Sequence, residues 1–390
     1  MSSDSRPLRI AIIAGEESGD LLGADLVRSL RRLSGRDVEL TGVGGQHLQA
    51  EGLKSQFDPG IIAIVGFSAV IRDLPRLIRL IGKTARQIVD AKPDCVVTVD
   101  SPAFNLRVAR KIRRMEPSIP IVKYVCPSVW AWLPSRAVKM KAFTDHVLCL
   151  LPFEPDELKR LGGPPGTFVG HRLAAHEGIA EARQMQTGRV RSNDDPKRLL
   201  ILPGSRTSEV KALSPEFAET VRLLAERGNR FDVVMPTLDR VEGLVRQAFS
   251  DLPANCEIVT GEDAKWRAFG QADAALAASG TVSLELALAG VPLISCYRTD
   301  ALIKLAYPFV TTWSASLPNL IADRPIVPEH YDRFVRPPHL ARTIEGLWQE
   351  GPTRDAQLEG FEQVRNALST KRPAGDLAAE IVLEQVMSKR

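Results

Sequence analysis

Short apolar runs alternate with helical patterns along most of the chain. In the first part, runs rich in Val, Ile and Leu predict strands at 8–15, 38–44, 94–100, 120–125, 146–152 and 166–171. Apolar residues recur at helical spacing between several of these runs, and the expected helices cover Asp20–Leu33, Arg72–Ala91 and Asn105–Met115. Strands that are apolar throughout and separated by helices favour a parallel sheet with both faces covered.

Residues 176–197 interrupt this alternation, because they are polar and lack strand character, and we interpret them as a linker. The pattern then restarts, with expected strands at 198–206, 231–236, 256–261, 272–279 and 291–297. Helices are expected over about 214–227, up to Leu288, and towards the C-terminus. We therefore predict an α/β protein with two Rossmann-like domains, whose parallel sheets face a cleft.

The expected domain boundaries follow from this pattern. The first domain covers 1–175, the second covers 198–365, and C-terminal helices over 366–390 pack back on the first domain. A chain of 390 residues is long enough for two such cores. In an open α/β sheet, ligands bind beyond the carboxyl ends of the strands, so the loops at those ends are the candidate sites.

Composition narrows the classes of function only slightly. The net charge of +4 is too small to indicate a nucleic-acid partner. The five cysteines are scattered without a C-x-x-C pair, which fits a reducing cytoplasm and no metal or redox role. No apolar run reaches the ~18 residues that a bilayer span needs, and the N-terminus lacks a signal-peptide pattern. We expect a cytoplasmic protein.

The segment ILPGSRTSEV, at 201–210, begins with the end of an expected strand. Small residues and one cation then follow, a pattern typical of phosphate binding. Gly204 and Ser205 permit close approach of a ligand, and the Arg206 guanidinium matches phosphate oxygens in a bidentate way. The alternative is an ordinary loop with a solvent-facing arginine. The residues therefore predict a phosphate contact, which a second loop of the same kind would strengthen.

That second loop lies in AALAASGTVSLELALAGVPLI, at 274–294. Ser279, Gly280 and Thr281 separate a strand from a helix, and the amides of a helix start attract anions. Glu285 lies about one turn further on, where its carboxylate can accept hydrogen bonds from ribose hydroxyls. The alternative for Glu285 is a first-turn acid that favours the helix dipole. Two anion-binding loops in one domain suit a diphosphate.

The first domain offers an acidic loop instead. Its first strand is followed by AGEESGDLLGADL, in which Glu16, Ser18 and Gly19 are candidates to bind the hydroxyls of a sugar acceptor. The G-x-G-x-x-G fingerprint of dinucleotide binding is absent. Helix capping by Ser18 and Asp20 is the alternative interpretation.

Asp100 ends another strand in TVDSPAFN, and a carboxylate at that position is a candidate general base. The alternative is an N-cap for the helix expected from about Asn105. Two tryptophans, Trp130 and Trp132, follow in a proline-rich loop, where they form either a ligand platform or core anchors. Core anchoring is the commoner role for such residues.

The segment 61–88 is unusually apolar at its start and basic afterwards. Its pattern is typical of a helix that lies on a membrane surface, with basic side chains near anionic head groups. The alternative is a core helix with a solvated basic face. The expected membrane contacts are Ile64, Val65, Phe67, Val70, Ile71, Leu74, Leu77 and Ile78.

No metal centre is expected. The chain has neither HExxH nor a D-x-D triplet, so a metal held between acids and a diphosphate has no visible ligands. Arg206 and helix N-termini can offset diphosphate charge instead. We predict no cofactor.

Several segments, taken together, resemble the lipid-A-disaccharide synthase family over nearly the whole chain. In order, they are AGEESGDLLGADL, VDSPAFN, YVCPSVWAWLPSR, LPFE, FVGH, ILPGSR, ASGTVSLELAL and SLPNLIA. The combination is far more specific than any one segment. The resemblance implies a GT-B fold and an inverting glycosyltransferase of lipopolysaccharide assembly in a Gram-negative bacterium, peripheral on the cytoplasmic face of the inner membrane.

The implied donor is UDP-diacylglucosamine, and the implied acceptor is 2,3-diacylglucosamine 1-phosphate. The products are a β-1,6-linked disaccharide and UDP. Asp100 matches the family aspartate proposed as base, and Asn319 matches a further active-site position. The residues that match the UDP-holding part are Ser205, Arg206, Ser279, Gly280, Thr281 and Glu285. The resemblance implies no metal.

The chain departs from the family at two points of one loop. Cys126 stands where serine is common, and Leu133-Pro134 follows WAW where an arginine is usual. The alternatives to this family are a UDP-N-acetylglucosamine 2-epimerase, another UDP-sugar transferase, or a two-domain small-molecule binding protein. The sequence leaves acyl-chain length, cleft closure and a homodimer open.

Overall fold

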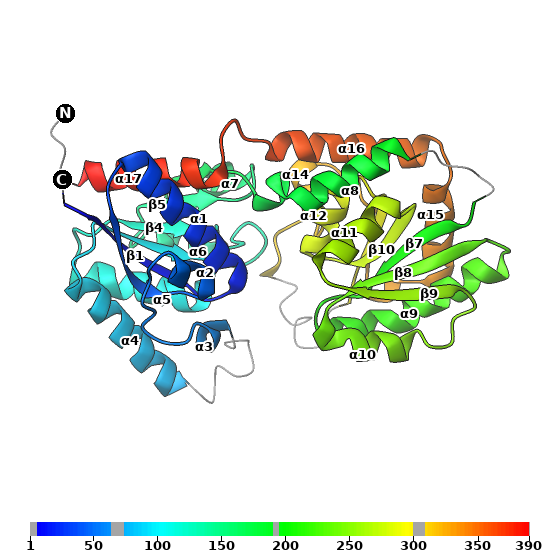
Figure 1. Ribbon diagram of the computed structural model, residues 1–390, viewed down its shortest axis with the longest axis horizontal. Coiled ribbons are helices and arrows are strands. Elements are labelled where there is room, and N and C mark those ends of the chain that lie inside the picture. The colour runs from blue at the N-terminus through cyan, green and yellow to red at the C-terminus, as the bar shows by residue number, and fades with distance from the viewer. Residues whose placement is uncertain (1–5, 64–73, 190–194, 299–308, 390) are drawn as a thin grey trace. The chain divides into compact units, whose positions relative to one another are not determined.

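The computed structural model describes residues 6–63, 74–189, 195–298 and 309–389. Two compact units make up the chain (Figure 1). Unit 1 comprises Met1–His171 together with Thr370–Arg390, and unit 2 comprises Arg172–Ser369. Among the described residues, no helix combines the length and the apolar content that crossing a bilayer demands.

Unit 1 is built on a six-stranded parallel sheet in the order β2-β1-β3-β4-β5-β6. The strands are β1 (Leu8–Ala14), β2 (Val38–Val43), β3 (Cys95–Val99), β4 (Ile121–Tyr124), β5 (His146–Cys149) and β6 (Gly166–Phe168). The helices are α1 (Glu17–Ser34), α2 (Gln46–Ala50), α3 (Gly60–Ala63), α4 (Leu74–Asp90), α5 (Pro102–Met115), α6 (Ser135–Met140), α7 (Glu154–Arg160) and α17 (Ala374–Ser388).

Both faces of this sheet are covered. Along β1, Ile10 and Ile12 belong to an apolar cluster with residues of α1 and α17, while Ala11 and Ile13 belong to a second cluster with residues of α4 and α5. Successive side chains of a strand point to opposite faces, so a strand buried on both faces is apolar at every position. This is why the apolar runs located the strands correctly.

The helix α17 completes unit 1 although it follows unit 2 in the sequence. It packs against α1, and the Ser29 hydroxyl donates to the Asp376 carboxylate at 2.9 Å in the buried interface. The chain returns to unit 1 at Thr370 rather than at the expected residue 366, because α16 (Pro352–Leu368) continues to Leu368.

Unit 2 repeats the same architecture, with the strand order β12-β11-β10-β7-β8-β9. Its strands are β7 (Lys197–Leu202), β8 (Phe231–Thr237), β9 (Asn255–Thr260), β10 (Ala274–Ala278), β11 (Leu293–Tyr297) and β12 (Glu329–Tyr331). Its other helices are α8 (Glu177–Gly188), α9 (Thr207–Glu226), α10 (Asp239–Ala248), α11 (Glu262–Gln271), α12 (Thr281–Ala289), α14 (Leu317–Ala322) and α15 (Pro337–Trp348). Short 3-10 turns cover Arg172–Ala175 and Asp332–Phe334. The predicted α/β class with two Rossmann-like sheets is confirmed.

The interpretation of 176–197 as a linker is wrong for residues 177–188, which form α8 and pack against α11 and α12. Gln186 is buried there, and its side-chain amide donates to the carbonyls of Phe269 and Ala272 at 2.6 and 2.8 Å. The segment is polar because a buried amide, rather than a wide apolar stripe, anchors this helix. Hydrophobic periodicity therefore could not reveal it.

Candidate active site

Unit 2 has a topological switch point between β7 and β10. From β7 the chain proceeds through β8 to β9 on one side, and it returns to β10 on the other side of β7. The loops after β7 and β10 therefore leave the sheet in opposite directions and open a crevice, which is where open α/β sheets bind ligands. The loop at Gly204–Arg206 and the loop at Ser279–Thr281 both lie at this point.

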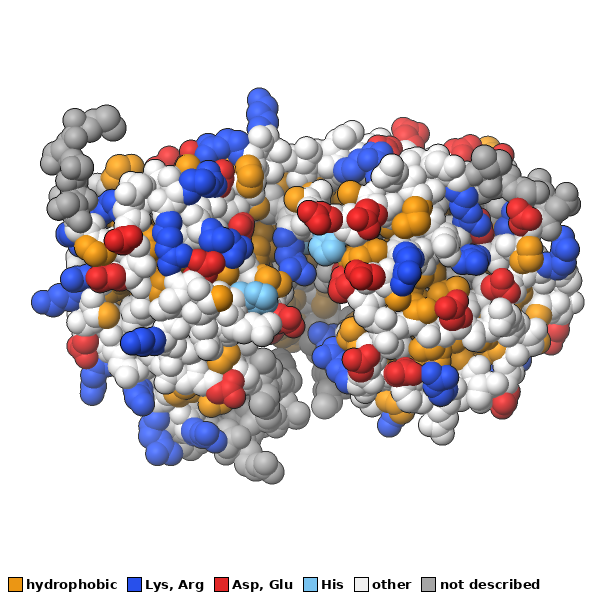
Figure 2. All heavy atoms as spheres, viewed as in Figure 1, with side chains coloured by type: hydrophobic (Ala, Val, Ile, Leu, Met, Phe, Trp, Pro, Cys, Tyr) orange, Lys and Arg blue, Asp and Glu red, His pale blue; other side chains and the backbone are white. Residues whose placement is uncertain are grey.

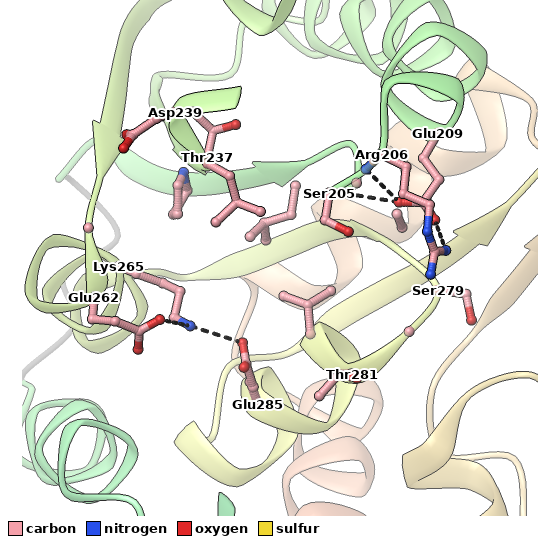
Figure 3. Close-up of a pocket in the computed structure, with 18 residues that line it drawn as sticks. Ser205, Arg206, Glu209, Thr237, Asp239, Glu262, Lys265, Ser279, Thr281 and Glu285 are labelled. Carbon is pink, nitrogen blue, oxygen red and sulfur yellow. Dashed lines mark hydrogen bonds and ion pairs between the residues drawn. The ribbon is translucent and has the colours of Figure 1, made fainter. Parts of the chain in front are cut away.

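A pocket of about 540 Å³ occupies the crevice (Figure 3). Both predicted anion-binding loops line it, joined by the residues after β8 and the start of α11. This volume is in the range of small-molecule sites. The polar residues around it are Ser205, Arg206, Glu209, Thr237, Asp239, Glu262, Lys265, Ser279, Thr281 and Glu285.

Arg206 caps the N-terminus of α9, and its side chain is 75% exposed on the pocket rim. Glu209, in the first turn of α9, accepts hydrogen bonds from the backbone N–H groups of Ser205 and Arg206 at 3.0 and 3.2 Å. The Arg206 guanidinium also donates to Glu209, at 2.7 Å. One carboxylate thus occupies the donors that a phosphate would use.

Gly204 is required for this arrangement. Its φ of 123° is unfavourable for residues with a side chain, and a Cβ there would lie 2.5 Å from Cβ of Glu209. Glu209 was not among the site residues predicted from the sequence. Its signal is the three-residue spacing from Arg206, which is the spacing of a capping box.

The start of α12 provides backbone donors. Gly280 is its N-cap and brings no side chain to occupy the first-turn N–H groups. Open space surrounds the Gly280 Cα, since no atom lies within 4 Å of the position where a Cβ would project. The Ser279 hydroxyl is turned towards the Ala315 carbonyl, at 3.1 Å. Helix amides facing an open pocket are suited to an anion.

Glu285 lies deeper in the pocket, with a side chain that is 15% exposed. Burial raises the pKa of its carboxyl group, and the neighbouring Lys265 opposes that rise. The Lys265 ammonium lies 3.4 Å from Glu285 and 3.1 Å from Glu262 (Figure 3). It also lies over the Trp266 ring, 3.9 Å from the ring centroid. Lys265 carried no signal in the sequence, because only the fold brings α11 beside α12.

Asn319 does not line the pocket. It is buried in α14, where its amide donates to the Val327 carbonyl and to Glu329, at 3.0 Å each. Its carbonyl oxygen accepts from the backbone N–H groups of Ile326 and Val327 at 2.9 and 2.7 Å. These bonds join α14 to the residues before β12 and to Glu329 in β12, and the active-site role of Asn319 stays a prediction.

Unit 1 has its own switch point, between β1 and β3, because β2 lies beyond β1 and β4 lies beyond β3. The acidic loop after β1 and the loop of Asp100 after β3 both begin there. They approach closely, since a Cβ on Gly15 would lie 2.6 Å from Ile62 and 2.9 Å from the Ser101 hydroxyl. The fold thus brings the predicted acceptor residues of unit 1 to one crevice.

Asp100 and Ser101 both adopt left-handed backbone conformations, with φ of 46° and 41°. Two successive non-glycine residues in this region are costly and mark a functional or tightly held turn. The helix α5 begins at Pro102 with Ser101 as its N-cap, so Asp100 is not the cap of a helix starting near Asn105. Its carboxylate, which is not used in capping, is available for other chemistry.

Glu16 is the N-cap of α1, and Glu16 and Ser18 are exposed at its start. Gly19 is buried and packs against β3, with its Cβ position 3.4 Å from a methyl carbon of Val99. Asp20 does not cap α1. Its carboxylate accepts from the backbone N–H groups of Gly45 and His47 at 2.6 and 2.8 Å and so caps α2.

Trp130 is an anchor within unit 1. Its indole N–H donates to buried Glu154 at 3.3 Å, and its ring meets Phe153 edge to face with centroids 5.2 Å apart. Burial raises the pKa of the Glu154 carboxyl group to about 7. These contacts favour the core-anchor interpretation of Trp130. Trp132 is half-buried.

The predicted membrane segment is only partly described. Ile64, Val65, Phe67, Val70 and Ile71 lie outside the described residues, and Leu74 opens α4. Leu77 is buried in the core of unit 1 with Ile81, Ala85 and Ile88. The prediction that Leu77 contacts the membrane is therefore wrong. Ile78 is 58% exposed. Figure 2 shows basic side chains gathered over the α4 region, which include exposed Arg76, Lys83 and Arg86.

Comparison with known proteins agrees with the sequence motifs. The sequence profile of the lipid-A-disaccharide synthetase family matches residues 10–369. A lipid-A-disaccharide synthase of Rhodopseudomonas palustris is 44% identical over 378 residues, which is 96% of this chain and 95% of the relative. One from Nitrobacter hamburgensis is 42% identical over 98% of this chain and 96% of the relative.

The chain belongs to the lipid-A-disaccharide synthase family. It is therefore a glycosyltransferase of lipid A disaccharide formation, and the match favours this family over the epimerase alternative.

Solved structures confirm the GT-B fold of this synthase family member. Acinetobacter baumannii MurG aligns with a TM-score of 0.59 and 16% identity, over 97% of this chain and all of that one. A Staphylococcus aureus MnaA structure with UDP aligns with a TM-score of 0.59 and 13% identity, over 96% of this chain and 95% of that one. At such identities the likeness concerns the fold alone, and the family membership comes from the sequence relatives.

Proposed function

We propose that the chain transfers 2,3-diacylglucosamine from UDP to the 6-hydroxyl of 2,3-diacylglucosamine 1-phosphate. The reaction forms a β-1,6 linkage with inversion at the anomeric carbon and releases UDP. The single observation that carries this proposal is the convergence of Arg206 and the α12 N-terminus on one pocket at the unit 2 switch point. Both are suited to a leaving diphosphate.

In this mechanism the nucleotide occupies the unit 2 pocket. The Arg206 guanidinium and the first-turn amides of α12 stabilise the negative charge that develops on the β-phosphate as its bond to the anomeric carbon breaks. Glu285 accepts hydrogen bonds from the ribose hydroxyls. When the phosphates bind, they compete with Glu209 for these donors.

Unit 1 supplies the base. The Asp100 carboxylate removes the proton of the acceptor 6-hydroxyl while that oxygen attacks the anomeric carbon from the face opposite UDP. The loop after β1, with Glu16, Ser18 and Gly19 at the same switch point, binds acceptor hydroxyls. Its acidic character suits a sugar and disfavours a second diphosphate.

The acyl chains of both substrates require access from a membrane surface. We propose that residues 64–71 together with exposed Ile78 provide this contact on the cytoplasmic face of the inner membrane, beside the basic side chains of α4. Leu77 takes no part, because it packs in the core.

The direct test is an assay with UDP-2,3-diacylglucosamine and the 1-phosphate monosaccharide, following disaccharide and UDP. We expect both products in equal amounts and no UDP release when the acceptor is omitted. Conversion of UDP-N-acetylglucosamine without acceptor would support the epimerase instead. Binding of UDP with no turnover under either condition would support a binding protein.

A further inference from the structure

A lysine is buried beneath the proposed base. Lys123 lies on β4 with only 1% of its surface exposed, and it is among the largest fully buried side chains of the described chain. It shares its face of the sheet with Ile121, which belongs to the apolar cluster of α4 and α5. A charged group in such a layer is costly unless it is fully hydrogen-bonded, so its position calls for a role.

The Lys123 ammonium reaches the carboxyl end of the sheet, where it donates to three backbone carbonyls. It donates to the Asp100 carbonyl at 2.5 Å, to the Tyr124 carbonyl at 3.2 Å and to the Thr98 carbonyl at 3.4 Å. Among the described residues, no carboxylate forms a salt bridge with this ammonium. Its hydrogen bonds thus converge on the end of β3, where the backbone enters the left-handed turn.

Asn105 holds the same turn from the other side. Its side-chain amide donates to the Asp100 carbonyl at 2.9 Å and to the Val99 carbonyl at 2.8 Å. The Asp100 N–H in turn donates to the Tyr124 carbonyl, at 3.0 Å. The Asp100 carbonyl thus accepts from two buried side chains, the neutral Asn105 amide and the Lys123 ammonium.

We propose that Lys123 is a positioning residue, which fixes the unfavourable backbone at Asp100 through a charge-assisted hydrogen bond to its carbonyl. This inference rests on the proposed role of Asp100 as base. A fixed backbone keeps the carboxylate in one orientation, and a misplacement of about 1 Å at a reacting group can cost about 10²-fold in rate.

The electrostatics around Lys123 are consistent with this role. Burial lowers the pKa of the ammonium to about 8, and the Asp100 carboxylate is the group that most opposes this decrease, followed by Cys126. The ammonium therefore loses its proton around pH 8, which weakens its hydrogen bonds to the turn. We expect kcat to decline above pH about 8 for this reason.

The test compares full-length Lys123→Met, Lys123→Gln, Asp100→Asn and the Lys123→Met/Asp100→Asn double variant. We expect Lys123→Met to lower kcat by about 10–100-fold with little change in KM and no decrease in Tm. Lys123→Gln keeps N–H donors and should recover part of the rate. The decline of kcat above pH about 8 should be absent in Lys123→Met. Thr98→Val, which removes a buried hydroxyl from β3 beside the same turn, is the control.

The double variant identifies the route of the effect. If Lys123 acts through Asp100, the double variant is no slower than Asp100→Asn alone. Independent, multiplying losses would overturn the positioning role, as would a wild-type kcat in a folded Lys123→Met protein. Wild-type turnover in Asp100→Asn would instead overturn the base assignment of the proposed function, which is a different result.

Discussion

The two units place opposite chemistry on the same topology. At the switch point of unit 2, the pocket rim carries an exposed guanidinium and a helix start without a capping side chain. At the switch point of unit 1, the loops carry carboxylates, and the cation lies buried beneath the backbone. A parallel sheet thus decides where a ligand binds, while the few residues after its strands decide the sign of the charge that is accepted.

This difference explains why a transferase of this fold needs both sheets. A leaving diphosphate requires positive charge, and a hydroxyl that must lose a proton requires a carboxylate. One crevice cannot present both without pairing them, as the contact between Arg206 and Glu209 in unit 2 illustrates. Separate units let the proposed base and the Arg206 guanidinium act without pairing with each other.

The largest expected effect tests the unit 1 side. Asp100→Asn should lower kcat by up to about 10⁴-fold, because it removes the proton acceptor while preserving shape. The dissociation constant of UDP, measured by calorimetry, should be unchanged, since we propose that the nucleotide binds to unit 2. A parallel loss of UDP affinity would show that the two switch points do not divide the work in this way.

Arg206→Ala tests the unit 2 side. We expect kcat to fall by about 10²–10³-fold and UDP to bind more weakly, because a stabilising donor to the leaving phosphate is lost. Arg206→Lys should recover only part of kcat and of the UDP affinity, since an ammonium lacks the bidentate geometry of a guanidinium. Arg222→Ala, on the same helix and paired with Glu219, is the matched control and should keep full activity.

A smaller effect concerns Lys265 and the pH dependence of nucleotide binding. Burial raises the pKa of Glu285 and Lys265 opposes the rise, so Lys265→Met should raise that pKa further. Glu285 then becomes protonated at a higher pH, and UDP affinity should begin to fall at a higher pH than in wild type. Titrations from pH 5 to 8 should show this shift, and superimposable curves would exclude Glu285 as a ribose contact.

The smallest effect concerns the surface of unit 1. Ile78→Ser should reduce partition to anionic vesicles by about 2–10-fold, the effect of one apolar side chain. Val138→Ser, at a site 57% exposed on α6 of the same unit, is the control. Equal losses in the two variants would show that unit 1 has no localised membrane contact near α4.

The sequence located the described strands except the three-residue β12, and it singled out both candidate anion-binding loops, because continuous apolar runs and small residues are local signals. It did not predict α8, which is anchored by the buried amide of Gln186. It also could not show that the Asn319 side chain accepts hydrogen bonds from backbone N–H groups. The role of Lys123 could not be predicted from sequence either. Its meaning depends on three carbonyls brought together by neighbouring strands, which no short segment encodes.

The return of α17 to unit 1 has a consequence for biosynthesis. A ribosome releases all of unit 2 before the residues of α17, so unit 2 can complete its core first although it comes second. The apolar face of α1 that α17 covers, with Ala378 and Val382, stays open during that interval. Unit 1 is therefore the part of the nascent chain that depends on shielding until α17 has been synthesised.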